Sequence, residues 1–190
     1  FKDVDLVKIT QEVLTKFALR ADKQKVNLSL DSTEQSIRIT GSETYLGEAI
    51  DNLIDNALLY GCPNGGVIHV ELKLEDHSAV LVIKDNGNGI DSNYIGNAVA
   101  RYATSKINRN SLDNIKSLGF RGEALYSISN ASKLTIVSKT EHMEEAWELK
   151  IAFGKKIKKR PSKGNKGTIV EVSDLFNNLP VRKKFLKSIR

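Results

Sequence analysis

Two adjacent runs of alternating apolar and polar residues constrain the fold of this chain most strongly. Residues 67–75 (VIHVELKLE) and 78–85 (SAVLVIKD) both alternate in the way of a half-buried strand, and only Asp76 and His77 separate them. A connection this short joins antiparallel neighbours, because parallel strands need a long crossover. We therefore expect an antiparallel pair whose apolar face is covered by other elements.

Helical spacing of apolar residues predicts three further elements. Residues 5–20 form an amphipathic helix, and Ser42 caps a second helix that runs to about Tyr60. Residues 123–129 (EALYSIS) form a third. Short alternating runs predict additional strands at 26–30 and 36–40, which we expect to pair with each other, and at 133–140, 147–153 and 167–176. A basic helix is expected at 181–190.

This order of strands and helices favours an α/β fold. We expect a two-layer sandwich with one mixed, mainly antiparallel sheet and helices on one face. At 190 residues the chain is predicted to be a single domain, 1–190. The helical and strand patterns weaken after Tyr94, and we expect a mobile lid at about 101–120.

The composition excludes some classes of protein. No run approaches the roughly 20 apolar residues of a membrane span, and the start, FKDVDLVKITQEV, is acidic where a signal peptide would be basic. We therefore expect a cytoplasmic protein without membrane contact. The single Cys62 excludes an internal disulfide and suggests no metal cage.

Much of the net charge of +6 lies in residues 154–167, GKKIKKRPSKGNKG. One interpretation is a solvated hairpin tip between strands. The other is a nucleic-acid contact, since clustered Lys and Arg release phosphate counterions.

The segment DNGNGI (85–90) ends the second strand of the central pair. Asn-Gly after a strand is a common hairpin turn, but the following residues do not resume a strand. Gly87 and Gly89 would let the backbone approach a flat ligand closely. Asp85 would accept a hydrogen bond from the amino group of adenine, whereas guanine presents an oxygen there.

A second segment, SLGFRGEAL (117–125), has glycines on both sides of Phe120 and Arg121 just before a helix. The free N–H groups of such a helix start bind phosphate, and the helix dipole favours the negative charge. Ser105 and Lys106 would add a hydroxyl and an ammonium group. The alternative is an ordinary loop with Arg121 in solvent.

A third segment, EAIDNLIDNALLY (48–60), places Glu48, Asn52 and Asn56 on one face of a helix. An amide carbonyl such as that of Asn56 is a suitable single ligand for Mg²⁺, which keeps waters and takes its other oxygens from phosphates. The alternative is that both amides cap neighbouring backbone or face water.

Together the three segments resemble the GHKL superfamily of Bergerat-fold ATP binders, which includes gyrase, heat-shock chaperones, histidine kinases and MutL. Residues 1–85 look like the catalytic domain of a sensor histidine kinase. Residues 86–190 look like the mismatch-repair ATPase MutL, in ARYATSKI, GFRGEALYSIS and GTIVEVSDLFNNLPVRKKFLKS. This change of family at a shared motif favours an engineered chimera or a reconstructed ancestral sequence.

The resemblance implies ATP or ADP and Mg²⁺ as ligands. It matches Asn56 to the magnesium ligand and Asp85 to the adenine reader, with Gly87 and Gly89 shaping the pocket. The other positions matched to the nucleotide site are Asn52, Tyr60, Ile90, Thr104, Ser105, Lys106, Gly119, Phe120, Arg121, Gly122, Glu123, Ala124, Leu125 and Thr168.

One departure from the family concerns catalysis. MutL and gyrase place a catalytic glutamate where this chain has Asn52, and losing a general base slows a reaction about 10²- to 10⁴-fold. We therefore expect weak or no hydrolysis. Glu48, one helical turn or about 6 Å away, is an alternative base. None of His69, His77 and His142 resembles a phosphoacceptor.

Three functions follow from the sequence. The first is an ATP- or ADP-binding domain with weak or no hydrolysis. The alternatives are an active MutL-like ATPase and a DNA-binding module of the mismatch-repair type. We expect a monomer, since the N-terminal strap of a MutL-like dimer has no counterpart in the sequence.

Overall fold

The computed structural model describes residues 2–76, 78–100 and 124–175. The predicted lid at about 101–120, His77 and the predicted helix at 181–190 lie outside these residues. The strands are β1 (Lys2–Asp5), β2 (Val26–Ser32), β3 (Arg38–Gly41), β4 (Gly66–Glu75), β5 (Ser78–Asp85), β6 (Lys133–Lys139), β7 (Ala146–Ala152), β8 (Lys155–Ser162) and β9 (Gly167–Ser173). The helices are α1 (Leu6–Lys23), α2 (Glu43–Asn56) with the π-turn η1 (Ala57–Gly61), the 3₁₀ turn η2 (Asn97–Val99) and α3 (Ala124–Ala131).

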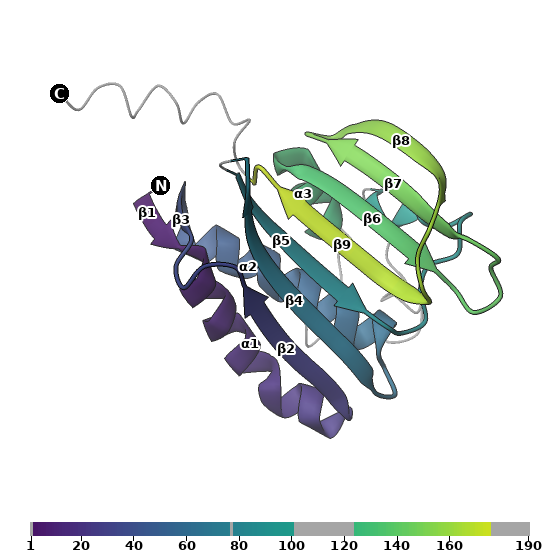
Figure 1. Cartoon of the computed structure of the whole chain (residues 1–190), viewed down its shortest axis with the longest axis horizontal. Coiled ribbons are helices and arrows are strands. Elements are labelled where there is room, and N and C mark those ends of the chain that lie inside the picture. The colour runs from purple at the N-terminus through teal and green to yellow at the C-terminus, as the bar shows by residue number, and fades with distance from the viewer. Residues whose placement is uncertain (1, 77, 101–123, 176–190) are drawn as a thin grey trace, which may run out of the picture.

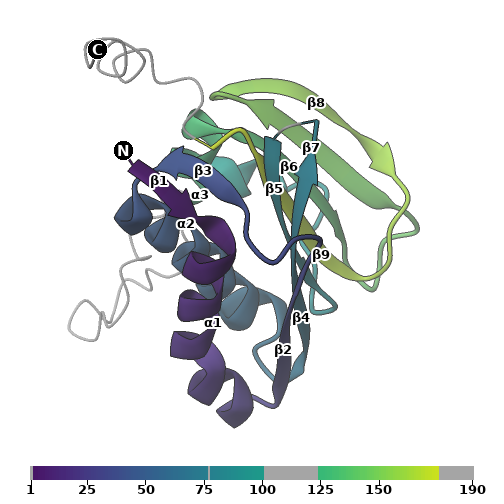
Figure 2. The same ribbon diagram turned by 60° about the vertical axis from the view of Figure 1, so that its left-hand side comes forward.

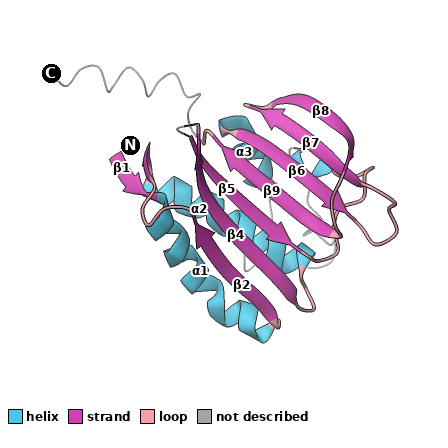
Figure 3. Ribbon diagram, in the orientation of Figure 1, coloured by secondary structure: helices cyan, strands magenta, loops and turns pink. Residues whose placement is uncertain are grey.

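Seven strands form the main sheet in the order β2-β4-β5-β9-β6-β7-β8 (Figure 1). Strands β2 and β4 run parallel, and every other neighbouring pair in this order is antiparallel. Helices α1, α2 and α3 lie on one face of the sheet (Figure 2). The predicted sandwich, with its mixed and mainly antiparallel sheet, is confirmed (Figure 3).

The predicted pairing of the strands near residues 26–30 and 36–40 is wrong. Strand β2 joins the edge of the main sheet beside β4, whereas β3 pairs with β1 in a separate two-stranded sheet. Ile37, which lies between β2 and β3, is buried, and its carbonyl oxygen accepts a 2.9 Å hydrogen bond from the backbone N–H of Leu6. This contact holds the segment before β3 against the start of α1 and away from β2. Alternation predicts that a segment is a strand, but it does not predict its neighbour.

The basic run is not a hairpin tip, and that interpretation is also wrong. Residues Lys155–Ser162 form β8, the last strand of the sheet, and the chain turns at Phe153 and Gly154, which both have positive φ. Lysines are common on edge strands, since their charges stay in water and discourage pairing with other chains.

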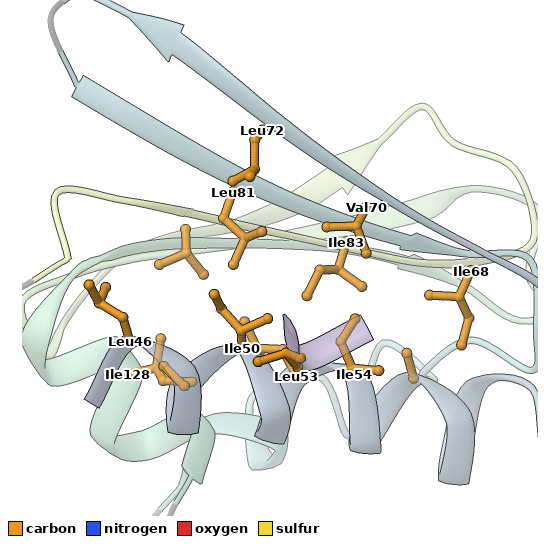
Figure 4. Packing of buried hydrophobic residues seen from close by; sticks show 14 of the residues in the cluster. Leu46, Ile50, Leu53, Ile54, Ile68, Val70, Leu72, Leu81, Ile83 and Ile128 are labelled. Atoms are coloured by element: carbon orange, nitrogen blue, oxygen red, sulfur yellow. The ribbon is translucent and has the colours of Figure 1, made fainter. Parts of the chain in front are cut away.

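Helix α2 packs its apolar face onto the centre of the sheet (Figure 4). Each side chain that is labelled in Figure 4 is at most 5% exposed, and full burial of such a residue stabilises the fold by about 1.5–3 kcal/mol. The packed residues are Leu46, Ile50, Leu53 and Ile54 of α2, Ile68, Val70 and Leu72 of β4, Leu81 and Ile83 of β5, and Ile128 of α3. Within the described ranges no helix is long and apolar enough to cross a membrane.

Candidate nucleotide-binding site

The end of helix α2 and the loop after β5 are joined by hydrogen bonds. The last turn of the helix widens into the π-turn η1, where the N–H of Cys62 donates to the Ala57 carbonyl at 2.8 Å. The backbone N–H of Asn88 donates to the Gly61 carbonyl at 2.9 Å, and its side-chain Nδ2 donates to the Tyr60 carbonyl at 3.2 Å. Such π-turns are frequent at functional sites.

Two glycines let this loop lie between the helix end and strand β6. A Cβ atom added at Gly87 would lie 1.7 Å from the Gly61 carbonyl oxygen. At Gly89, where φ is +71°, a Cβ atom would lie 2.0 Å from the Lys139 carbonyl oxygen. The nearest described neighbours of both glycines are thus backbone atoms of the protein itself, which gives each glycine a structural reason apart from ligand binding.

Asp85 ends strand β5 at the bottom of this loop. Its Oδ1 accepts hydrogen bonds from the backbone N–H groups of Gly87 (3.0 Å) and Thr168 (3.3 Å). Its Oδ2 has no hydrogen-bond partner among the described residues. Burial raises the pKa of Asp85, and the two backbone bonds oppose that effect. The two backbone bonds therefore hold the carboxylate in one orientation, and no described residue bonds to Oδ2.

A row of three polar residues crosses the sheet at this point. Asp85 is opposite Thr168 in the β5–β9 pair, and Thr168 is opposite Ser138 in the β9–β6 pair, so the three side chains share one face. Ser138 Oγ lies 2.9 Å from Thr168 Oγ1 and 2.8 Å from the backbone nitrogen of Ile90. This row connects Asp85, Thr168 and Ile90, three of the predicted nucleotide-binding residues.

Sequence reasoning missed Ser138. The residue is 1% exposed, and it lies on the same face of β6 as the buried Leu134 and Ile136. A polar residue at an apolar position of an alternating strand is the signal that would have identified it.

The two asparagines of helix α2 differ in their contacts. The Nδ2 group of Asn52 donates a 2.7 Å hydrogen bond to the backbone carbonyl of Glu48, one turn earlier. The half-buried side chain of Asn56 has no hydrogen-bond partner among the described residues. The side chain of Glu48 is exposed.

The aspartates that precede these asparagines face helix α1. Asp51 forms an ion pair with Lys16, and Asp55 Oδ1 lies 2.5 Å from Arg20 Nη1. Consecutive residues of a helix are rotated by about 100°, so Asn52 and Asn56 are turned away from the contact with α1. The two ion pairs thus mark the side of α2 that faces α1, and both amides lie on a different side of the helix.

The remaining predicted residues fall into two groups. Tyr60 is 39% exposed at the helix end, and Ala124 and Leu125 open α3, which packs against α2 and β6. The positions that lie outside the described residues are Thr104, Ser105, Lys106, Gly119, Phe120, Arg121, Gly122 and Glu123.

Residues 44–179 match the family described as histidine kinase-, DNA gyrase B- and HSP90-like ATPases. The DNA mismatch repair protein MutL of Herminiimonas arsenicoxydans is 42% identical over 143 residues, which cover 73% of this chain and 22% of that protein. MutL of Allorhizobium ampelinum is 43% identical over 143 residues, which cover 75% of this chain and 22% of that protein. The chain therefore spans about a fifth of the length of these relatives.

Among solved structures, the mycobacterial sensor histidine kinase MprB has a TM-score of 0.61 at 18% identity, covering 90% of this chain and 96% of that one. The N-terminal domain of a DNA repair protein has a TM-score of 0.53 at 34% identity, and the match covers 74% of this chain and 39% of that one. The first likeness concerns the fold alone.

The MutL likeness extends further than residues 86–190, because the matched 73% of the chain is more than that segment contains. It therefore includes part of the segment that precedes residue 86. The GHKL resemblance is confirmed by the match over residues 44–179 together with the mixed sheet and its one-sided helix layer. The chain belongs to the family of histidine kinase-, DNA gyrase B- and HSP90-like ATPases.

Proposed function

We propose that this domain binds ATP or ADP together with Mg²⁺ and hydrolyses ATP slowly or not at all. The observation that carries the proposal is the Asp85 carboxylate, with Oδ1 held by two backbone N–H groups and Oδ2 without a partner in the described part of the chain.

The Asp85 carboxylate fits the amino group of adenine. A partly buried acceptor without a protein partner is stabilised by a ligand that donates a hydrogen bond to it. A keto group at the same place, as in guanine or hypoxanthine, would put two acceptors against each other. Sites of this kind reject the mismatched ligand strongly, since a buried polar group is left unpaired.

Asn56 fits the role of a magnesium ligand. Its amide oxygen is not engaged by any described residue, in contrast to the amide of Asn52, which donates to its own helix. Mg²⁺ commonly takes one or two protein oxygens and completes its shell with waters and phosphate oxygens. When bound, the ion would neutralise phosphate charge, and Asn56 would hold it at the end of α2.

Asn52 is the reason to propose weak turnover. Its amide oxygen can accept a hydrogen bond from water, but an amide does not take a proton at neutral pH. The missing general base accounts for a loss of about 10²- to 10⁴-fold. Binding and catalysis are thus separated in this site.

Calorimetric titration with ADP and Mg²⁺ tests the binding. We expect saturable heat from the parent and affinity about 10- to 100-fold weaker for Asp85→Asn, since the new NH₂ group faces the amino group of adenine. Asp31→Asn is the matched control, because Asp31 is an exposed carboxylate on β2. No heat from a folded parent, or equal affinity in Asp85→Asn, would overturn the proposal.

A second candidate is an active MutL-like ATPase, favoured by the identity to MutL proteins and by the exposed Glu48 one turn from Asn52. This candidate predicts rapid phosphate release by the parent and a loss of at least about 10²-fold in Glu48→Gln. Slow release that Glu48→Gln leaves unchanged would remove it.

A third candidate is DNA binding, favoured by the exposed cations of β8 and by the mismatch-repair role in the names of the relatives. Lys155, Lys156, Lys158 and Arg160 are exposed, while Lys159 Nζ lies 5.3 Å from the centroid of the Trp147 ring. Phosphate contacts by these groups predict affinity that falls steeply with salt. Binding to duplex DNA that is undetectable or independent of salt would exclude this candidate.

A further inference from the structure

Ser138 is at the centre of a hydrogen-bond network that sequence reasoning did not identify. Its Oγ lies 2.8 Å from the backbone nitrogen of Ile90, 3.0 Å from the carbonyl oxygen of Gly167 and 2.9 Å from Thr168 Oγ1. The side chain is fully enclosed at 1% exposure, so these groups are its neighbours in place of water.

The number of hydrogens that each group carries fixes the direction of each hydrogen bond. A serine hydroxyl has one hydrogen and can accept two bonds. The Ile90 N–H can only donate, and the Gly167 carbonyl can only accept, so the Ser138 hydrogen goes to Gly167. If all three bonds are made, Thr168 must donate its own hydrogen to Ser138.

The hydroxyl of Thr168 is then left with lone pairs alone for a ligand. Thr168 and Asp85 are register partners on one face of the sheet, and the backbone N–H of Thr168 already donates to Asp85 Oδ1. The row therefore presents two acceptors, Asp85 Oδ2 and Thr168 Oγ1, and no side-chain donor.

We propose that Ser138 is a positioning residue that accepts a hydrogen bond from the Thr168 hydroxyl. This bond makes the row of Asp85, Thr168 and Ser138 selective for an exocyclic amino group over a keto group. This inference rests on the proposed function, and it assigns part of the selectivity for adenine to a residue that need not touch the nucleotide. Without Ser138, the Thr168 hydroxyl is free to rotate and to donate its hydrogen to a keto oxygen.

The test compares the dissociation constants of ADP and inosine diphosphate, which carries a keto group where adenine has its amino group. Calorimetry in the presence of Mg²⁺ gives both values for the parent and for Ser138→Ala. We expect ADP to be preferred by the parent, and the ratio of the two constants to fall about tenfold in Ser138→Ala, since a hydrogen bond then becomes available to the keto oxygen. Ser138→Cys is the second variant if Ser138→Ala does not fold, because a thiol is only a weak donor and acceptor.

Two comparisons separate this role from a loss of packing. Ser132→Ala is the matched control: Ser132 is also a fully buried serine, directly before β6, and its Oγ donates to the Ile128 carbonyl at 2.6 Å. Its ratio should equal that of the parent. In a Thr168→Val background, Ser138→Ala should leave the ratio unchanged, since there is no hydroxyl to redirect.

An unchanged ratio in folded Ser138→Ala, or an equal fall in the Thr168→Val background, would overturn the role of Ser138 while leaving nucleotide binding intact. If the folded parent binds neither nucleotide, the proposed function itself fails, and the two outcomes are thus distinguishable.

Discussion

The side-chain nitrogen of Asn52 donates a 2.7 Å hydrogen bond to the backbone carbonyl oxygen of Glu48. The bond turns the amide back along its own helix and leaves its oxygen as the group available to a ligand or a water. A glutamate at position 52 could not make this bond, since an ionised carboxylate has no hydrogen to donate. The bond therefore requires an amide at this position, and an amide does not supply a general base at neutral pH.

Asn52→Glu should create hydrolytic activity. A carboxylate at this position supplies the missing general base, and we expect phosphate release to rise by about 10²-fold or more. Asn52→Gln is the matched control, because it has the length of glutamate and the neutral amide of asparagine. Equal rates in the two variants would show that basicity at position 52 does not limit turnover.

Asp85→Asn should stabilise the ligand-free fold at neutral pH. Burial raises the pKa of Asp85 above its ordinary value of 3.8, so the folded chain holds this proton more tightly than the unfolded chain. The contribution to stability is full below pH 3.8 and is lost as the pH rises through the folded pKa. Asparagine stays neutral and can accept the same two backbone bonds.

Urea unfolding of parent and Asp85→Asn at several pH values measures this effect. The midpoint of the variant should be the higher one at pH 7, and the difference should disappear below pH 3.8. A parent that is more stable than the variant at pH 7 would contradict the assigned effect of burial.

Gly89→Ala should destabilise the fold and weaken nucleotide binding. The φ of +71° disfavours any side chain by about 1–2 kcal/mol, and the new Cβ would lie 2.0 Å from the Lys139 carbonyl oxygen, which adds a steric clash. Gly96→Ala is the control, since φ there is −68° and no described atom beyond the neighbouring residues of the chain lies within 4 Å of the new carbon. Its free energy of unfolding should stay within about 0.5 kcal/mol of the parent.

Arg20→Met should lower stability more than Lys16→Met. The Asp55 side chain is 11% exposed, so losing the guanidinium removes a charged hydrogen bond worth about 1.5–3 kcal/mol. The Asp51 side chain is 28% exposed and its Lys16 partner 66%, which limits that pair to about 1 kcal/mol or less. Denaturant midpoints of the two variants give the order, and equal losses would contradict it.

Local patterns predicted most of the fold. The hairpin of β4 and β5, the helices α1, α2 and α3, and the strands β6, β7 and β9 all match runs with a clear period. Strand β1 has four residues and passes directly into α1, too short for an alternation to be visible. The partners of β2 and β3 depend on contacts between distant residues, which periodicity does not contain.

Only part of the candidate site could be predicted from the sequence. The loop after β5 and the Asn-bearing helix are continuous in sequence, so their residues could be proposed from motifs. Ser138 enters the site only because β5, β9 and β6 are neighbours in a particular register. The bond from Asn52 to Glu48 spans one helical turn and agrees with the alternative interpretation that an amide there caps neighbouring backbone.

We propose that the nucleotide site is complete for binding and incomplete for catalysis. The most direct test is to incubate the parent with ATP and Mg²⁺, separate the protein from free nucleotide after several hours, and identify what is bound. We predict intact ATP in the protein fraction, with less than one phosphate released per chain. Bound ADP with many phosphates released per chain, or a folded protein that carries no nucleotide at all, would contradict the claim.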